Sequence, residues 1–195
     1  MKTYLLDASA AVEIYLNPYR RPSKIDDILE EKDKAAANIF IPNICVAEAF
    51  NTFARKHFAP KKDDNPLSSH DYQRCLEQFR EDIHWGKKIY PYDLNRYHII
   101  ATDKIVLAEH LHLPKADEKD HLNTFDILVI AMACELAYLG ERENTFLVTG
   151  DARMHRVCET LRKKQIDILN EGPLGKLDQK RWRPPYCTLI KPRSR

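Results

Sequence analysis

Residues 145–154 read TFLVTGDARM, an apolar run that ends at Thr149, Gly150 and Asp151. A short apolar run closed by glycine is typical of a buried strand, and an aspartate in front of Ala152 is a common start of a helix. The same arrangement occurs near the N-terminus, where Asp7 follows the apolar run YLL and precedes a helical pattern. These stretches predict strands that lead directly into helices, which is typical of an α/β fold.

Short strand-like segments alternate with helical patterns along the whole chain. We expect strands at 3–7, 38–41, 145–149, 166–169 and 187–190, and helices at 9–16, 23–33, 43–58, 68–85, 95–113, 125–139 and 152–164. Serines 23 and 68, each followed three residues later by an aspartate, are expected to cap their helices. The pattern predicts an α/β fold with a central, mostly parallel sheet of four to five short strands and helices on both faces.

A chain of 195 residues is suited to one domain with a substantial core. We expect this domain to cover residues 1–175, with insertions near 59–66 and 86–94 where prolines and polar residues interrupt the helical patterns. Residues 176–195 hold seven basic residues and one acid, whereas the rest of the chain is net acidic. This basic C-terminal extension could contact a polyanion or only increase solubility, and composition favours neither.

Five cysteines without a CxxC pair predict a reduced, cytoplasmic protein rather than a disulfide framework. The longest apolar run, residues 127–134, is too short to cross a bilayer, so no membrane association is expected.

Four carboxylates have related local settings. Asp7 and Asp151 follow expected strands, Glu48 lies near the start of the helix after the second strand, and Asp126 opens a strongly apolar helix. In an open α/β sheet, ligands bind outside the carboxyl ends of the strands, where strand ends and helix starts meet. Acidic groups gathered there need a cation to be stable. The sequence therefore predicts a metal-dependent site that acts on phosphate esters.

Each of these acids also has a purely structural explanation. Asp7 and Asp151 are good helix caps, and Asp126 occupies the third position of a helix that Asn123 can cap. Glu48 fits a solvated helix surface as well as the wall of a cleft. Periodicity alone does not decide between the two explanations.

The order of the four acidic segments resembles that of the PIN-domain family of metal-dependent nucleases, best known from VapC-type toxins. The resemblance covers most of the chain and lies in four blocks: YLLDASAAVEIYL with Asp7, IPNICVAEAFNTFARK with Glu48 and Asn51, NTFDILVIAMACEL with Asp126, and TFLVTGDARM with Thr149 and Asp151.

This resemblance implies an endoribonuclease that hydrolyses phosphodiester bonds in single-stranded RNA with Mg²⁺ or Mn²⁺. It implies Asp7, Asp126 and Asp151 as direct or water-bridged metal ligands and Glu48 as a ligand or water-orienting group. Ser9 and Thr149 are auxiliary candidates, because their hydroxyls can position a carboxylate or a phosphate. The alternatives are a DNA or structure-specific nuclease and a catalytically silent nucleic-acid-binding module.

The chain departs from compact toxin-type members in its long interval between Glu48 and Asp126 and in Arg153, where the family often has a further acid. Together with the basic end, these differences favour a stand-alone nuclease over a toxin, while an antitoxin-type protein partner and a homodimer stay open.

The C-terminal motif Arg181-Trp182-Arg183 is a candidate for nucleic-acid binding, since its aromatic ring could stack on a base and its arginines could pair with phosphates. Alternatively, Trp182 and Tyr186 pin the C-terminal segment onto the domain, with 187–190 as an edge strand.

Overall fold

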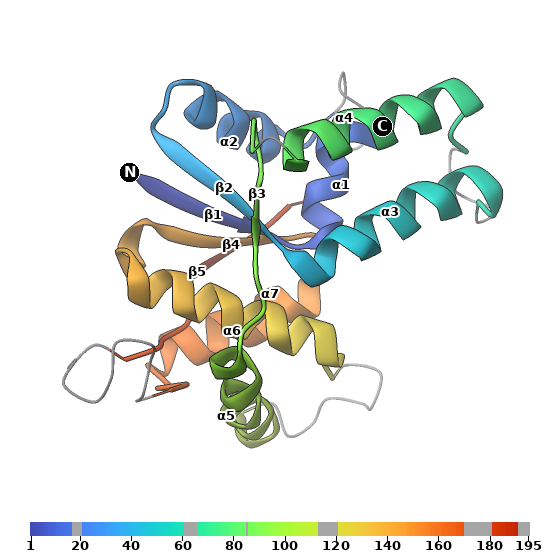
Figure 1. Ribbon diagram of the computed structural model, residues 1–195. Coiled ribbons are helices and arrows are strands. Elements are labelled where there is room, and N and C mark those ends of the chain that lie inside the picture. The colour runs from blue at the N-terminus through green and yellow to red at the C-terminus, as the bar shows by residue number, and fades with distance from the viewer. Residues whose placement is uncertain (17–20, 61–65, 85, 113–120, 170–180, 191–195) are drawn as a thin grey trace.

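A computed structural model describes residues 1–16, 21–60, 66–84, 86–112, 121–169 and 181–190. Five parallel strands form one sheet in the order β3-β2-β1-β4-β5 (Figure 1). They are β1 (Lys2–Leu6), β2 (Ala37–Pro42), β3 (Tyr90–Tyr92), β4 (Thr145–Thr149) and β5 (Tyr186–Leu189).

The helices cover the sheet on both faces. They are α1 (Ala8–Leu16), α2 (Ser23–Asp33), α3 (Asn43–Phe58), α4 (Ser69–His84), α5 (Arg96–His112), α6 (Thr124–Leu139) and α7 (Ala152–Lys163), with a short 3-10 turn at Arg142–Asn144. Helices α1 to α4 lie on one side of the sheet and α5 to α7 on the other (Figure 1). This arrangement confirms the predicted α/β fold.

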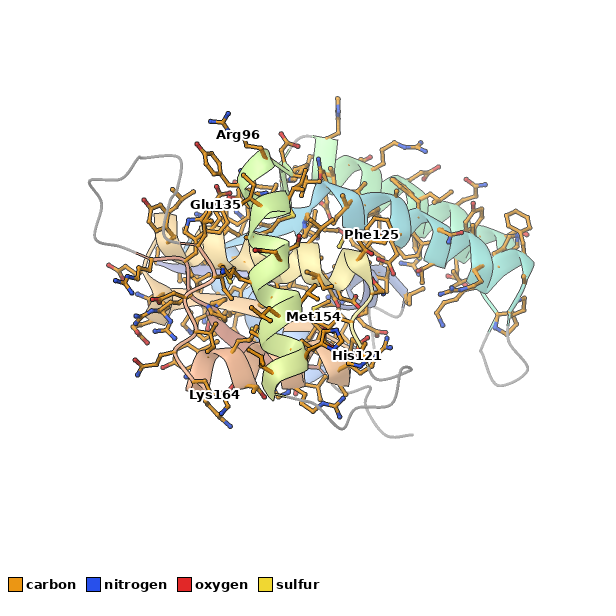
Figure 2. The ribbon with its side chains drawn as sticks, turned by 90° about the horizontal axis from the view of Figure 1, so that it is seen from below. Arg96, His121, Phe125, Glu135, Met154 and Lys164 are labelled. Carbon is orange, nitrogen blue, oxygen red and sulfur yellow. The ribbon has the colours of Figure 1, made fainter. Side chains whose placement is uncertain are left out.

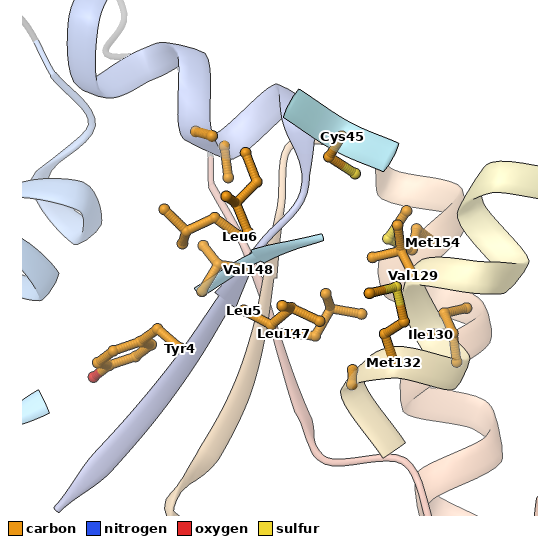
Figure 3. Close-up of a cluster of buried hydrophobic side chains, with 14 of the residues drawn as sticks. Tyr4, Leu5, Leu6, Cys45, Val129, Ile130, Met132, Leu147, Val148 and Met154 are labelled. Atoms are coloured by element: carbon orange, nitrogen blue, oxygen red, sulfur yellow. The ribbon is translucent and has the colours of Figure 1, made fainter. Parts of the chain in front are cut away.

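The core lies on both sides of the two central strands. Tyr4, Leu5 and Leu6 of β1 are all buried, as expected for a parallel strand with both faces covered. Leu5 is in register with Leu147 of β4, and both side chains lie toward the apolar residues of α6, including Met132 (Figure 3). This packing fixes α6 against the centre of the sheet.

Most of the expected elements are present, with three corrections. Residues 166–169 do not form a strand, because only an isolated antiparallel bridge joins Leu169 to Trp182. Strand β3 was missed, since its two tyrosines and central proline were interpreted as a break between helices. Ser68 donates to and accepts from Asp71 as predicted, but Ser23 is the first residue of α2 and Pro22 holds the cap position.

The C-terminal segment is built into the domain as far as the structure describes it. Trp182 is 1% exposed and its backbone pairs with Ile168 and Leu169, while β5 forms the edge of the sheet. The prediction that Trp182 stacks on a base is therefore wrong, because its ring is inside the core. Arg181 and Arg183 both bind Asp167. Residues 176–180 and 191–195 lie outside the described residues, as do 61–65 of the expected insertion near 59–66.

The five cysteines are buried and none forms a disulfide bond. Within the described ranges, no helix combines the length and the apolar character needed to cross a membrane.

A buried polar network fixes α6 to β3 and α5. The carboxylate of Glu135, on α6, accepts hydrogen bonds from the Tyr92 hydroxyl and from Asn95 Nδ2, and its Oε2 lies 2.6 Å from His98 Nε2. His98 and Glu135 are 0% and 2% exposed as side chains. Burial acts to raise the pKa of Glu135, but these hydrogen bonds and His98 outweigh it and leave the pKa below its usual value.

We predict that Glu135→Ala lowers the free energy of unfolding by about 3 kcal/mol or more, because it leaves Tyr92, Asn95 and His98 without their buried acceptor. Urea unfolding at neutral pH measures this change. Glu77→Ala, which removes an exposed glutamate from helix α4, is the matched control and should stay within about 0.5 kcal/mol of wild type. Equal effects of the two substitutions would contradict a stabilising role for the network.

Candidate active site

The strand order reverses between β1 and β4, which run side by side although the chain leaves them toward opposite edges of the sheet. In doubly wound sheets this reversal opens a crevice at the carboxyl ends of the two strands. Asp7 follows β1 and Asp151 follows β4. Helix α3 carries Glu48 and begins where β2 ends, and α6 carries Asp126 in its first turn.

The starts of α6 and α7 lie at the same end of their helical layer. Figure 2 shows Phe125 and Met154, from the first turns of α6 and α7, toward one side, and Glu135 and Lys164 toward the other. The four predicted acids therefore belong to the same edge of the sheet.

The carboxylate of Asp7 is held by groups from α1 and β4. Its Oδ1 accepts from the backbone N–H of Ala10 at 2.7 Å, and Ser9 Oγ lies 2.7 and 2.9 Å from its two oxygens. From the neighbouring strand, Thr149 Oγ1 donates to Oδ2 at 2.5 Å. The hydroxyls of Ser9 and Thr149 thus orient Asp7, which is 5% exposed.

The same two hydroxyls also fix the end of β4. Gly150 N–H donates to Ser9 Oγ at 2.7 Å, and Asp151 N–H donates to Thr149 Oγ1 at 2.9 Å. A Cβ atom on Gly150 would lie 2.9 Å from Ser9 Oγ, so a larger residue here would force the Ser9 side chain away from the end of β4. One continuous set of hydrogen bonds therefore links Asp7 to the residue that begins α7.

Asp126 takes part in the capping of its own helix, whose N-cap residue is Asn123. Its backbone N–H donates to Asn123 Oδ1 at 3.0 Å and its Oδ2 accepts from Asn123 N–H at 3.2 Å, which completes a capping box. Asp151 likewise accepts from the backbone N–H groups of Arg153 and Met154 as the cap of α7. The capping explanation is thus correct as a description of these side chains, and it leaves their chemical role open.

Arg153 is the basic group bound to the acidic residues. Its Nη2 donates to Asp151 Oδ2 at 3.0 Å, and its Nη1 lies 3.5 Å from the carbonyl oxygen of His121. Burial acts to raise the pKa of Asp151, but Arg153 and the backbone N–H groups of α7 hold it below its usual value.

Glu48 differs from the other three acids because its side chain is exposed. It lines an open pocket of about 380 Å³ whose other walls are apolar or amide groups, from Ile44, Ala47, Asn51 and Phe125. Phe125 is 57% exposed and belongs to the same turn of α6 as Asp126. A ligand that reaches the acids would therefore meet an apolar surface beside them.

The acids influence one another's protonation. Burial raises the pKa of Asp7 to about 6 against three hydrogen-bond donors that lower it, and the charge of Glu48 adds to the rise. Burial also raises the pKa of Asp126, with the charges of Asp151 and Glu48 acting in the same direction. This mutual repulsion is the electrostatic condition that a bound cation relieves.

The donor set is made of carboxylate and hydroxyl oxygens, which suits Mg²⁺ or Mn²⁺. Within the described residues, however, no three His, Cys, Asp or Glu side chains already surround a common point at which they could hold a metal ion. Asp126 and Asp151 face the N–H groups of their own helices. A shared cation would need these two side chains to turn toward Asp7 and Glu48.

Sequence reasoning missed the groups that hold the segment before α6. The buried Glu109, on α5, accepts from Leu122 N–H at 3.0 Å and lies 3.4 Å from His121 Nδ1. With Arg153 on the carbonyl of His121, these contacts fix the residues that lead into Asn123. Of these residues, only Arg153 could be singled out from the sequence, because it stands where the PIN-domain family often has a further acid.

A larger cavity of about 760 Å³ lies elsewhere, between α1 and α4, and includes Tyr15, Arg74 and Asp82 in its walls. None of the four acids lines it. Size alone therefore does not identify the active site of this protein.

No protein-family model and no curated protein sequence matches this chain. Among solved structures, it is similar to a chain in the crystal structure of VapBC2 from Rickettsia felis bound to a DNA fragment from their promoter. The superposition has a TM-score of 0.50 at 17% sequence identity and covers 80% of this chain and 92% of that chain. The two share a fold. At this identity the similarity extends no further than the fold.

We predict that Asp7 makes the stability of the metal-free protein depend on pH. The folded state keeps the proton of Asp7 up to about pH 6, whereas the unfolded chain loses it near the usual value of 3.8. The folded state therefore binds more protons in this window, and stability falls as the pH rises through it. Asn does not titrate, so Asp7→Asn should gain about 2–3 kcal/mol relative to wild type between about pH 4 and pH 7.

Chemical unfolding in the presence of a chelator, repeated across this pH range, gives the comparison. Asp103→Asn, an exposed site on α5, serves as the control. A difference between Asp7→Asn and wild type that is the same at both ends of the range would show that Asp7 is not protonated in the folded state.

Proposed function

We propose that this protein is a divalent-metal-dependent endoribonuclease of the PIN type that hydrolyses single-stranded RNA at the edge formed by Asp7, Glu48, Asp126 and Asp151. The observation that supports the proposal is that these four acids, from distant parts of the sequence, belong to the edge of the sheet at which the strand order reverses and that their charges act on one another. The fold adds support, because the sequence resembles VapC-type nucleases and the similar solved structure is a VapBC complex.

Each residue of the site can have a separate role in the reaction. Mg²⁺ or Mn²⁺, when bound, supplies positive charge that activates water and stabilises the leaving oxygen. Asp7, oriented by Ser9 and Thr149, offers a fixed anionic ligand at the bottom of the site. Glu48 is exposed and can accept a proton from a water molecule. Asp126 and Asp151, at the starts of α6 and α7, add further negative charge to the site.

The pocket beside Glu48 provides a place for the substrate outside the acids. The exposed ring of Phe125 can stack on a base, an interaction that tolerates any sequence and favours a single strand over a duplex. This feature favours single-stranded RNA, although base stacking by itself would also accept single-stranded DNA.

A silent nucleic-acid-binding module is the second candidate, and a specific observation favours it. Asp7, Asp126 and Asp151 all accept N–H groups at the start of a helix and are thereby explained without catalysis. In this case these three acids would contribute stability alone.

The partner is also a matter of proposal. The similar solved structure contains a VapBC pair, so an antitoxin-type protein with a basic segment would be a suitable occupant of the acidic edge. We favour a stand-alone nuclease, because the chain has a long interval between Glu48 and Asp126 and a basic C-terminal end that compact toxins do not need.

We predict that the protein cleaves a labelled single-stranded RNA in the presence of Mg²⁺ or Mn²⁺ and that a chelator stops the reaction. Asp126→Asn should lower the rate by at least about a hundredfold, since the amide has no negative charge for a cation. Asn can still accept the N–H of Asn123, so helix α6 and the circular dichroism spectrum should be unchanged.

Gel-resolved turnover of this RNA, and of a DNA strand with the same sequence, separates the alternatives. Faster cleavage of the DNA would favour the DNA nuclease. RNA binding without turnover, equal in wild type and Asp126→Asn, would establish the silent module instead. Asp103→Asn is again the control for a change of one negative charge.

A further inference from the structure

Arg153 occupies a position that is electrostatically unfavourable for a cation. It is the second residue of α7, and the N-terminal end of a helix carries partial positive charge, which disfavours a basic side chain there. The side chain nevertheless folds back over Asp151 rather than extending into solvent. The attraction between Arg153 and the acids at this edge offsets the unfavourable interaction with the helix end.

The guanidinium of Arg153 joins the two helix starts that frame the acidic edge. It contacts both carboxylate oxygens of Asp151, with Nη2 at 3.0 Å from Oδ2 and Nε at 3.5 Å from Oδ1. Nη1 lies 3.5 Å from the carbonyl oxygen of His121, before α6, and the positive charge also acts on Asp126. Arg153 is thus held against Asp151 and the segment before α6, near enough to Asp126 for its charge to act on that carboxylate.

The same guanidinium is accessible to a ligand, since the Arg153 side chain is 38% exposed. A guanidinium has five N–H donors in a planar fork, so one such group can hold a carboxylate and a phosphate at the same time. Phosphodiester oxygens are the anions that would approach this edge when RNA is bound there.

We propose that Arg153 is the phosphate-binding residue of the site: its guanidinium stays anchored on Asp151 and donates to a non-bridging oxygen of the RNA phosphodiester. This inference rests on the proposed nuclease function. It adds to that function a basic residue at a position where the PIN-domain family often has a further acid. A consequence is that Arg153 opposes metal binding while it favours substrate binding, because it adds positive charge among the acids.

The test compares Arg153→Ala with Arg156→Ala. Arg156 lies one turn further along α7 and is exposed, and within the described residues its side chain has no hydrogen bond or ion pair with the four acids. The two variants therefore lose the same charge from the same helix. The first measurement is calorimetric titration of the metal-free protein with Mn²⁺. Arg153→Ala should bind Mn²⁺ at least about threefold more tightly than wild type, because a positive charge close to the cation is removed. Arg156→Ala should match wild type.

The second measurement is the affinity for a short fluorescent single-stranded RNA, with Ca²⁺ replacing Mg²⁺ to slow turnover. Arg153→Ala should bind this RNA about tenfold more weakly and reduce the log–log salt slope by about 0.7, the value for one phosphate contact on a single strand. Arg153→Lys keeps the charge without the planar fork, so its Mn²⁺ affinity should stay near wild type while its RNA affinity falls part of the way.

Tighter Mn²⁺ binding together with weaker RNA binding in Arg153→Ala alone supports the proposal. Equal effects of Arg153→Ala and Arg156→Ala, or an unchanged RNA affinity in Arg153→Ala, would overturn it. If the wild-type protein neither binds Mn²⁺ nor cleaves RNA, the proposed function itself fails, and this result is distinct from a metal-dependent nuclease in which Arg153 has no effect.

Discussion

The hydrogen bond from Thr149 to Asp7 connects the ends of the two central strands, and the candidate site is arranged around it. It places a buried carboxylate at the point where the strand order reverses, which would be costly without the donors that surround it. Thr149 also accepts from Asp151 N–H, and Ser9 accepts from Gly150 N–H, so the start of α7 is fixed by the same group of atoms. The strand ends and the helix start therefore cannot move independently of Asp7.

The two explanations of the acids are compatible in physical terms. A carboxylate that caps a helix accepts N–H groups with one or two lone pairs, and a carboxylate has about four acceptor positions. Capping holds the main chain of Asp126 and Asp151 in place and does not consume their charge. The four acids therefore still place several negative charges close together, and only that of Asp151 is paired here with Arg153. At Asp7, burial and the charge of Glu48 oppose ionisation and raise the pKa to about 6. At Asp7 and Asp126, whose pKa values are raised, stability alone would be better served by asparagine, since asparagine caps helices about as well.

The sequence was sufficient for the elements whose signals are local. Asp7, Asp126 and Asp151 could be placed because each follows or begins an element with a strong apolar pattern, and parallel strands bring their carboxyl ends to one edge. Strand β3 could not be recognised, since three residues with a central proline have almost no strand signal of their own and pair only at the edge of the sheet. The burial of Trp182 depends on contacts with Ile168 and Leu169 and with the ring of His98, which are distant in sequence. The contact of Arg153 with Asp151 is local in sequence. Its position at the candidate site could not be recognised from the sequence, because this depends on Asp126 and His121, which are distant along the chain.

Thermal unfolding of wild type, Asp7→Asn and Asp151→Asn, each with and without Mg²⁺ or Mn²⁺, tests most directly whether the four acids form a cation site. A folded protein that binds the cation is stabilised by roughly 2–3 kcal/mol when the metal is well above its dissociation constant. We expect wild type to gain this amount and both variants to lose most of the gain. Without metal, Asp7→Asn should keep or exceed the stability of wild type, because the pKa of Asp7 is raised, whereas Asp151→Asn should be less stable because it loses the ion pair with Arg153. An equal gain in all three proteins, or no gain in any of them, would contradict the account.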